Sequence, residues 1–356
     1  MEQQLLSACE KGIVEDVRQL LNNPTINLNC QDTSKSKRTP LYLACDFGHV
    51  EIVALLLKDE RVDINKAIEY GQTPLYIACE KGYSKVVELL LSNNKVDVNE
   101  PKTNGKTPFY TACEKGFIET VRLLLNDKRV DVNKVENNMD ATPFYAACEN
   151  GNIDVVKLLL KDERVDVNKA ESNVGATPFY VACERGHIEV ARLLSKDERI
   201  NLTEANTWNE TPFNIACEKG HIEIMKLLLN DDRVDMNKEM NNGNGPTSFW
   251  TVCIHGCIEI VKLLLASEKK IDIKKKWNDT SALDISKERS TSTQKYNWET
   301  EEEYQKTKKN CSLIVQLLES FQMNPDETRS KLRKEVKYCI FLLIYIYIFH
   351  LTNSNY

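Results

Sequence analysis

Glycine is scarce in this chain, with 13 among 356 residues, and the usual glycine-dependent motifs are missing. There is no phosphate-binding loop and no Gly-x-Ser-x-Gly turn that would expose a nucleophilic serine. Long blocks of lysine and arginine are also missing from the main body of the chain, and the net charge is −6. Because binding to phosphates needs clustered positive charge, we expect nucleic acid not to be the partner.

What the chain has instead is one ten-residue segment, Thr73–Gly82, that recurs along its length. Close copies begin at Thr39, Thr107, Thr142, Thr177 and Thr211, and weaker copies begin near Gln3, Thr247 and Thr280. From Thr39 the successive offsets are 34, 34, 35, 35, 34, 36 and 33 residues. A nearly fixed period of this length predicts an array of about nine structural repeats.

Each repeat reads as a pair of short helices. The Thr73 hydroxyl is placed to cap a helix, Pro74 suits its first position, and Gly82 suits its end. Residues 86–91 form an apolar stripe at helical spacing, which predicts a second helix. Helices this short are unstable in water alone. The repeats must therefore bury their apolar faces against one another, as in a solenoid.

This pattern resembles the ankyrin repeat, whose signature is Thr-Pro-Leu-His-x-Ala. Tyrosine usually replaces the histidine here, at Tyr42, Tyr76, Tyr110, Tyr145 and Tyr180. The resemblance implies an all-α fold, an ankyrin-type α-solenoid of about nine helix-turn-helix repeats with short finger loops. The expected array covers residues 1–320, with repeats near 3–38, 39–72, 73–106, 107–141, 142–176, 177–210, 211–246, 247–279 and 280–320.

The last repeat departs from the others. Its second helix is expected to begin only at Ser312, so we interpret residues 289–308 as an inserted loop, partly helical near Glu301. Such an insert either carries function or is simply tolerated on one surface. After it, residues 321–337 read as a polar and basic linker, followed by a short apolar tail at 338–356.

The tail contains an apolar run at residues 338–351, which is shorter than the ~20 residues of a spanning helix. Three interpretations remain open. It is a short membrane anchor with basic residues on its cytoplasmic side, a terminal segment buried by this chain or a partner, or a neutral extension.

The chain has 12 cysteines, and eight of them occupy the same slot of successive repeats. Helices of neighbouring repeats pack about 8–10 Å apart, beyond the reach of a disulfide. These thiols suit a reducing compartment. No N-terminal signal peptide is visible, because Met1–Gln4 leads directly into the first repeat. We therefore expect a cytoplasmic protein, or a membrane-associated one if the tail inserts.

No catalytic or metal-binding constellation emerges. His49, His187 and His221 each follow a glycine at equivalent places, which indicates a role in turns. Cys253-Ile254-His255-Gly256-Cys257 lacks a second ligand pair at zinc-like spacing. Acidic pairs such as Asp162-Glu163 recur beside an arginine and read as a solvated surface network. We expect no enzyme, no metal and no cofactor.

What remains is a surface. The resemblance implies that partners bind a concave face, formed by the finger tips and the exposed side of the first helices. Matching positions, our candidates for partner binding, are Phe47, Tyr70, Glu80, Lys81, Asn104, Glu114, Lys115, Met139, Glu184, Arg185, Trp208, Glu218 and Lys219. The charged set repeats almost unchanged, so a solvated helix face is the slightly favoured explanation for it. Exposed aromatics are better interface anchors, which favours Phe47, Tyr70 and Trp208.

These observations predict a non-catalytic interaction module or adaptor, monomeric, that binds a protein partner along the concave face. The alternative is an adaptor of the same kind held at a membrane by residues 338–351.

Overall fold

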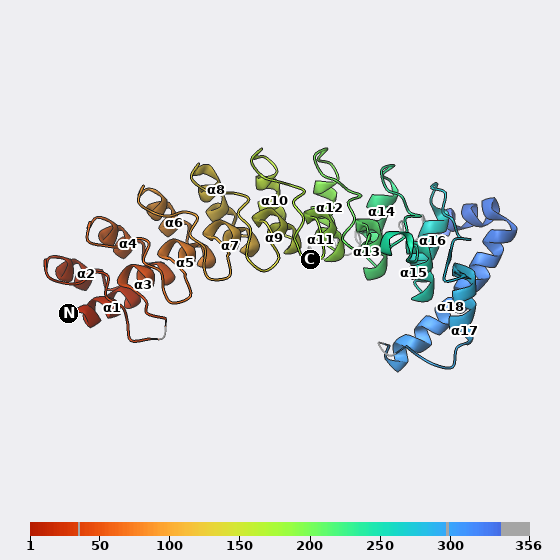
Figure 1. The fold of residues 1–356 in the computed structure, drawn as a ribbon, viewed down its shortest axis with the longest axis horizontal. Helices are drawn as coiled ribbons and strands as arrows, with labels where there is room; N and C mark the ends of the chain where they lie inside the picture. Colours follow the sequence, from red (N-terminus) through yellow and green to blue (C-terminus); the bar gives the residue numbers. More distant parts are fainter. Residues whose placement is uncertain (35, 297–298, 336–356) are drawn as a thin grey trace, which may run out of the picture. The chain divides into compact units, whose positions relative to one another are not determined.

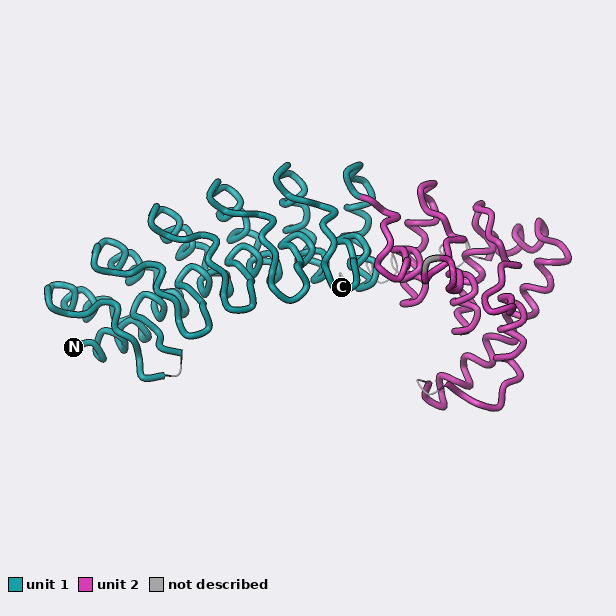
Figure 2. Tube along the Cα trace, in the orientation of Figure 1, with its two compact units in different colours: residues 1–200 teal, residues 201–356 magenta. Residues whose placement is uncertain are grey.

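The computed structural model describes residues 1–34, 36–296 and 299–335, without the side chain of Asn242. The chain divides into two compact units, Met1–Ile200 and Asn201–Tyr356 (Figure 2). Within each unit, paired helices stack in repeat order (Figure 1). The predicted all-α solenoid is thus confirmed for the described residues. No helix among them is long and apolar enough to cross a membrane, and the run at 338–351 lies outside them.

Unit 1 contains six helix pairs. The first helices α1, α3, α5, α7, α9 and α11 form one row, and the second helices α2 to α12 form another (Figure 1). Their bounds are α1 Glu2–Lys11, α2 Val14–Leu21, α3 Pro40–Asp46, α4 Val50–Leu57, α5 Pro74–Lys81, α6 Ser84–Leu91, α7 Pro108–Lys115, α8 Ile118–Asn126, α9 Pro143–Glu149, α10 Ile153–Leu159, α11 Pro178–Glu184 and α12 Ile188–Leu194.

Unit 2 contains three more pairs and two short strands. Its elements are α13 Pro212–Lys219, α14 Ile222–Leu229, the 3₁₀ turn η1 Asn241–Gly243, α15 Ser248–Ile254, α16 Ile258–Ala266, β1 Lys276–Trp277, β2 Thr280–Ser281, α17 Ala282–Thr291 and α18 Glu301–Met323. β1 and β2 pair antiparallel, so the finger before α17 is a small β-hairpin.

The third repeat shows why these segments fold as they do. The Thr73 hydroxyl accepts a hydrogen bond from the Tyr76 N–H at 3.1 Å, and Pro74 takes the first helical position. Gly82 ends α5 at φ 74°, and a Cβ there would lie 2.8 Å from the Phe117 ring of the next repeat. Glycine is therefore required at this turn both by its backbone conformation and by the packing of the neighbouring repeat.

The core runs between the two rows of helices. In the third repeat Leu75, Ala78 and Cys79 from α5 meet Val86, Val87 and Leu90 from α6, and all six side chains are fully buried. Because the same slots recur in every repeat, each stack has one continuous apolar core and no repeat has a core of its own.

The last repeat corrects one prediction. α18 begins at Glu301, not at Ser312, because a capping box forms there: the Thr300 hydroxyl accepts from the Glu303 N–H and Glu303 Oε2 accepts from the Thr300 N–H. Within the expected insert at 289–308, residues 289–291 belong to α17 and residues 301–308 belong to α18, so the expected helix near Glu301 is present and residues 292–300 separate the two helices. Along α18 the buried side chains are Tyr304, Cys311, Ile314, Leu318 and Phe321.

The predicted linker is also different in its described part. Residues 325–335 are helical and Leu332 is buried. Arg329 Nε donates to the Leu265 carbonyl at 3.3 Å, and Arg333 Nε donates to the Ala266 carbonyl at 2.9 Å. Two of the basic residues thus cap the C-terminus of α16 and do not lie in a free linker.

Candidate functional site

The finger tips are joined to one another through their backbones. In unit 1 the Tyr70 carbonyl accepts from the Thr103 N–H at 3.1 Å, and the Asn104 carbonyl accepts from the Asn137 N–H at 3.0 Å. The next two tips repeat this bond between the Met139 carbonyl and the Ser172 N–H. These bonds tie the backbone of each predicted finger residue to the next finger, so less backbone ordering is needed when a partner binds.

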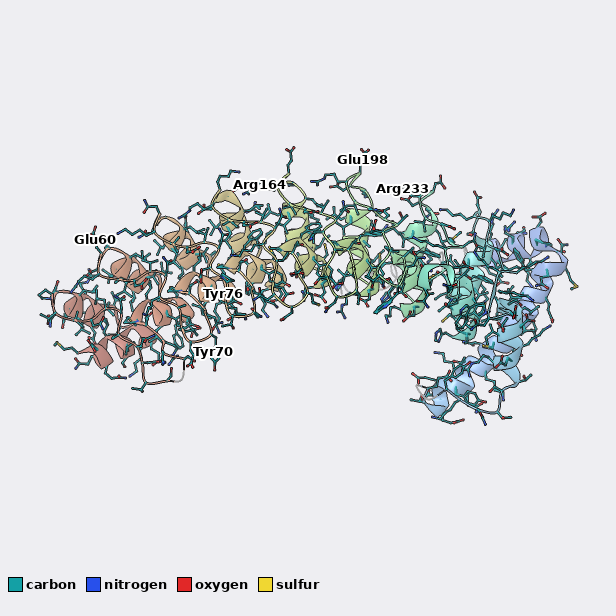
Figure 3. All side chains as sticks on the ribbon, viewed as in Figure 1. Glu60, Tyr70, Tyr76, Arg164, Glu198 and Arg233 are labelled. Atoms are coloured by element: carbon teal, nitrogen blue, oxygen red, sulfur yellow. The ribbon has the colours of Figure 1, made fainter. Side chains whose placement is uncertain are left out.

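The exposure of these residues differs. Tyr70 in unit 1 is 55% exposed and Trp208 in unit 2 is 56% exposed, whereas Asn104 and Met139 are half-buried. The Trp208 carbonyl accepts from the Asn241 N–H at 2.6 Å, the same link within unit 2. Figure 3 places Tyr70 on the finger edge of unit 1, while Glu60, Arg164 and Glu198 lie on its opposite edge.

Two buried glutamates, which the sequence analysis did not single out, fix the backbone conformation of their fingers. Glu136 is 1% exposed and its carboxylate accepts from the Asn138 and Met139 N–H groups at 2.9 and 2.6 Å. Glu171 does the same for its own finger, with three N–H donors at 2.8–2.9 Å. The sequence does contain a signal for this role, because each glutamate lies six residues before the threonine of a Thr-Pro pair, Thr142 and Thr177.

The charged ends of the first helices are linked by ion pairs. Lys106 Nζ lies 2.6 Å from Glu114 Oε1, and Lys102 Nζ lies 3.7 Å from Glu80 Oε1. Three further ion pairs involve predicted residues: Lys81 with Asp46, Arg185 with Glu149, and Lys219 with Glu218. Of the other two candidates, Lys115 is exposed and Glu184 is half-buried. Pairs at this exposure contribute ~0–1 kcal/mol each.

Phe47 stands apart from this charged row. It is 45% exposed at the end of α3, and its ring stacks on that of His49 with centroids 6.1 Å apart. His49 Nε2 lies 3.1 Å from the Glu10 carbonyl oxygen, and His187 Nε2 lies 2.9 Å from that of Glu149. Since a carbonyl oxygen only accepts, Nε2 of each histidine is the donor. These two histidines therefore connect the turns of successive repeats.

A family model of ankyrin repeats in three copies matches residues 5–102, 94–171, 165–240 and 182–276. The chain belongs to the ankyrin repeat family. Ankyrin repeats are in general a protein–protein interaction fold and are in general non-catalytic.

Among curated relatives, human oxysterol-binding protein-related protein 1 is 48% identical over 64 residues, and its rat counterpart is 44% identical over 64 residues. Each match covers 16% of this chain and 7% of the relative. This chain therefore resembles only a short segment of those proteins, 7% of their length.

On the edge opposite the fingers, the ankyrin loops are bound together by arginines. Arg129 pairs with Asp127 in its own loop at 2.6 Å and donates through Nη2 to the Leu91 carbonyl of the preceding repeat at 3.0 Å. We call this arrangement the arginine clamp; in unit 1 it is formed by Arg61, Arg129, Arg164 and Arg199. The arginine's hydrogen bond lowers the pKa of the paired aspartate below its usual range in each clamp.

An asparagine ladder runs beside the clamps. Asn65 Nδ2 donates to the Lys95 carbonyl at 2.8 Å, and Asn65 Oδ1 accepts from the Asp97 N–H at 2.8 Å. Within unit 1 the donor half of this link recurs at Asn29, Asn99, Asn133 and Asn168. Since one amide satisfies a donor and an acceptor of the next loop, the ladder fixes the register between ankyrin repeats.

The buried ionisable groups are inert rather than reactive. Burial raises the pKa of the core thiols, to about 12 for Cys9 and about 11 for Cys311, so few thiolates form at neutral pH. Tyr76 lies buried between repeats with its hydroxyl accepting from Thr111 Oγ1 at 2.9 Å, and burial raises its pKa well above the usual range. Among residues 1–34, 36–296 and 299–335, no group of three or more His, Cys, Asp or Glu is placed to hold a metal ion.

Proposed function

We propose that this ankyrin array is a non-catalytic adaptor that binds a protein partner through its finger tips and the exposed ends of its first helices. The observation that carries the proposal is Tyr70: a large aromatic side chain, more than half exposed, on a finger whose backbone is already fixed. Rigid exposed aromatics are the commonest energetic anchors of interfaces. Trp208 has the same properties in unit 2.

The test compares the two edges of unit 1. A photo-crosslinking amino acid is placed at Tyr70 or, as the control, at Glu198 on the opposite edge (Figure 3), in the full chain expressed in its native cells. We expect discrete protein adducts at position 70 and none shared with position 198. Tyr70→Ala should then weaken binding of the captured partner at least about tenfold, as for a hot spot. Equal adduct patterns at both positions would reject the proposal.

We also propose that the protein acts in the cytoplasm as a monomer. The eleven described cysteines are all free, and ten of them are buried in the core. Such a core is compatible with a reducing compartment and gains nothing from an oxidising one. Alkylation of thiols in freshly lysed cells under denaturing conditions should label every cysteine of a single-mass species, and a protein recovered with oxidised pairs would contradict this.

A further inference from the structure

One junction of unit 1 lacks its arginine clamp. Between the second and third repeats the clamp position belongs to Lys95, and Asn93 stands where the paired aspartate would be. Lys95 is exposed, and its ammonium makes no hydrogen bond or ion pair to any described residue. The junctions on either side have complete clamps, made by Arg61 and Arg129.

A groove of about 780 Å³ opens at this same junction. It is lined by the two loops that a clamp would join, residues 58–60, 62–65 and 92–95, together with Ala54, Leu57 and Leu89. At the neighbouring junctions the corresponding space is reached by a guanidinium group.

The residues of the groove include the equivalents of three residues whose carbonyl oxygens accept hydrogen bonds from an arginine at the preceding junction. Arg61 donates to the carbonyls of Leu21, Asn23 and Pro24 at 3.2, 3.0 and 3.0 Å. The equivalents at the open junction are the carbonyls of Leu57, Asp59 and Glu60, and all three residues line the groove. Within the described residues no side chain donates to any of the three. The Asp59 carbonyl accepts from the Val62 N–H at 3.1 Å, as the Asn23 carbonyl accepts from the Ile26 N–H at 3.5 Å beside its bond from Arg61.

The groove offers acceptors for a cation, although its charged side chains nearly balance. Leu57 is the last residue of α4, so its carbonyl lies at the negative end of that helix. The lining holds the carboxylates of Asp59, Glu60 and Asp63 against the ammonium groups of Lys58 and Lys95. Of these carboxylates, Asp59 is paired with Arg61, whereas Glu60 has no ion pair among the described residues.

We propose that this groove binds a guanidinium group, supplied by an arginine side chain of a protein partner. The planar guanidinium has five donors in a fixed fork, which matches the three carbonyls that Arg61 engages one junction earlier. The chain's own side chain at this position is Lys95, and its ammonium donates to none of the three carbonyls. The site itself stands on the geometry of the junction, and only the source of the arginine rests on the proposed adaptor function.

The experiment titrates the isotope-labelled full chain with Nα-acetyl-arginine amide and, in a parallel arm, with Nα-acetyl-lysine amide at equal ionic strength. We expect saturable amide shifts confined to residues 54–65 and 92–95 with the arginine compound. Binding of the lysine compound should be about tenfold weaker, the equivalent of one charge-assisted hydrogen bond. The absence of a saturable shift, or equal binding of both compounds, would overturn the proposal.

Two variants provide matched controls. The double variant Asn93→Asp with Lys95→Arg supplies the missing clamp from within, so it should lose the binding and melt at a higher temperature. The reverse variant Asp127→Asn with Arg129→Lys should open an equivalent groove one repeat later and gain a second set of shifts. Unchanged binding in the first variant would overturn the site whether or not Tyr70 binds a partner. If the natural chain forms a concentration-dependent dimer and the Asn93→Asp, Lys95→Arg variant abolishes it, the arginine comes from a second copy of this chain and not from a different protein, and that part of the proposal is wrong.

Discussion

At the scale of single residues, the clamp aspartates give the array a defined response to acid. Asp162 accepts from Arg164 at 2.7 Å, and this hydrogen bond holds the pKa of its carboxyl below the usual value. A group whose pKa is depressed by folding stabilises the folded state above its unfolded pKa, about 3.9 for aspartate. That stabilisation is lost as the pH falls through the folded pKa.

We therefore expect the contribution of the clamps to the free energy of unfolding to be constant above about pH 5 and to fall below about pH 4. Asp162→Asn should lower stability at pH 7 by up to about 1 kcal/mol and reduce the slope of stability against pH in the acid range. Denaturant melts between pH 3 and 7 measure both effects. Asp154→Asn, at an exposed pair with Lys157, is the matched control, and an equal effect there would contradict a special role for the clamp.

At the scale of helices, the sequence predicted most elements because each repeat carries its own boundary signals. Thr107 and Pro108 begin α7 as expected, and Gly116 ends it. The start of α18 was predicted at Ser312 because the other repeats have shorter second helices and the last repeat was compared with them. The spacing from Tyr304 through Cys311 and Ile314 already continued the buried seam one turn after Thr300, and only comparison with shorter repeats suggested a loop.

The candidate site was predictable only in part, for a physical reason. Exposed positions such as Tyr70 follow from their place in the repeat. Whether a side chain is half-buried, as Met139 is, depends on the conformation of its finger. That conformation is set by a carboxylate such as Glu136 turning back to its own backbone, a local arrangement with no periodic signature.

Substitution of the caps separates the two possible starts of α18. Thr300→Ala removes the hydroxyl that accepts from the Glu303 N–H, and should destabilise unit 2 by about 0.5–2 kcal/mol. Ser312→Ala lies in mid-helix on an exposed face and should be neutral or slightly stabilising. Thermal melts of the full chain provide the comparison. A larger loss from Ser312→Ala would place the start of the helix at Ser312, where the repeat pattern predicts it.

At the scale of the whole molecule, the division into two units has a direct consequence for folding. In Met1–Ile200 each helix pair contacts its neighbours and the core is continuous through six repeats. Stability of such an array is approximately a sum of repeat and nearest-neighbour terms. A fragment of residues 1–200 should therefore fold by itself with the helical content of six pairs.

Circular dichroism and a cooperative melt of that fragment test the expectation. The matched variant is Cys113→Asp, which puts a charge into the buried slot of α7 and should abolish the transition. A fragment that stays unfolded while the full chain melts cooperatively would show that unit 1 has no independent core.

The asparagine ladder bears on how such a chain changes its length. The side-chain amide of each ladder asparagine bonds to the loop of the following repeat, as that of Asn65 does with Lys95 and Asp97. Excision of residues 66–99 would bring Asn65 to face the loop that Asn99 now holds through the Arg129 carbonyl and the Asp131 N–H. The same donors and acceptors would meet at the new junction. Whole repeats can therefore be gained or lost between equivalent asparagines while the hydrogen bonds between neighbouring loops stay the same.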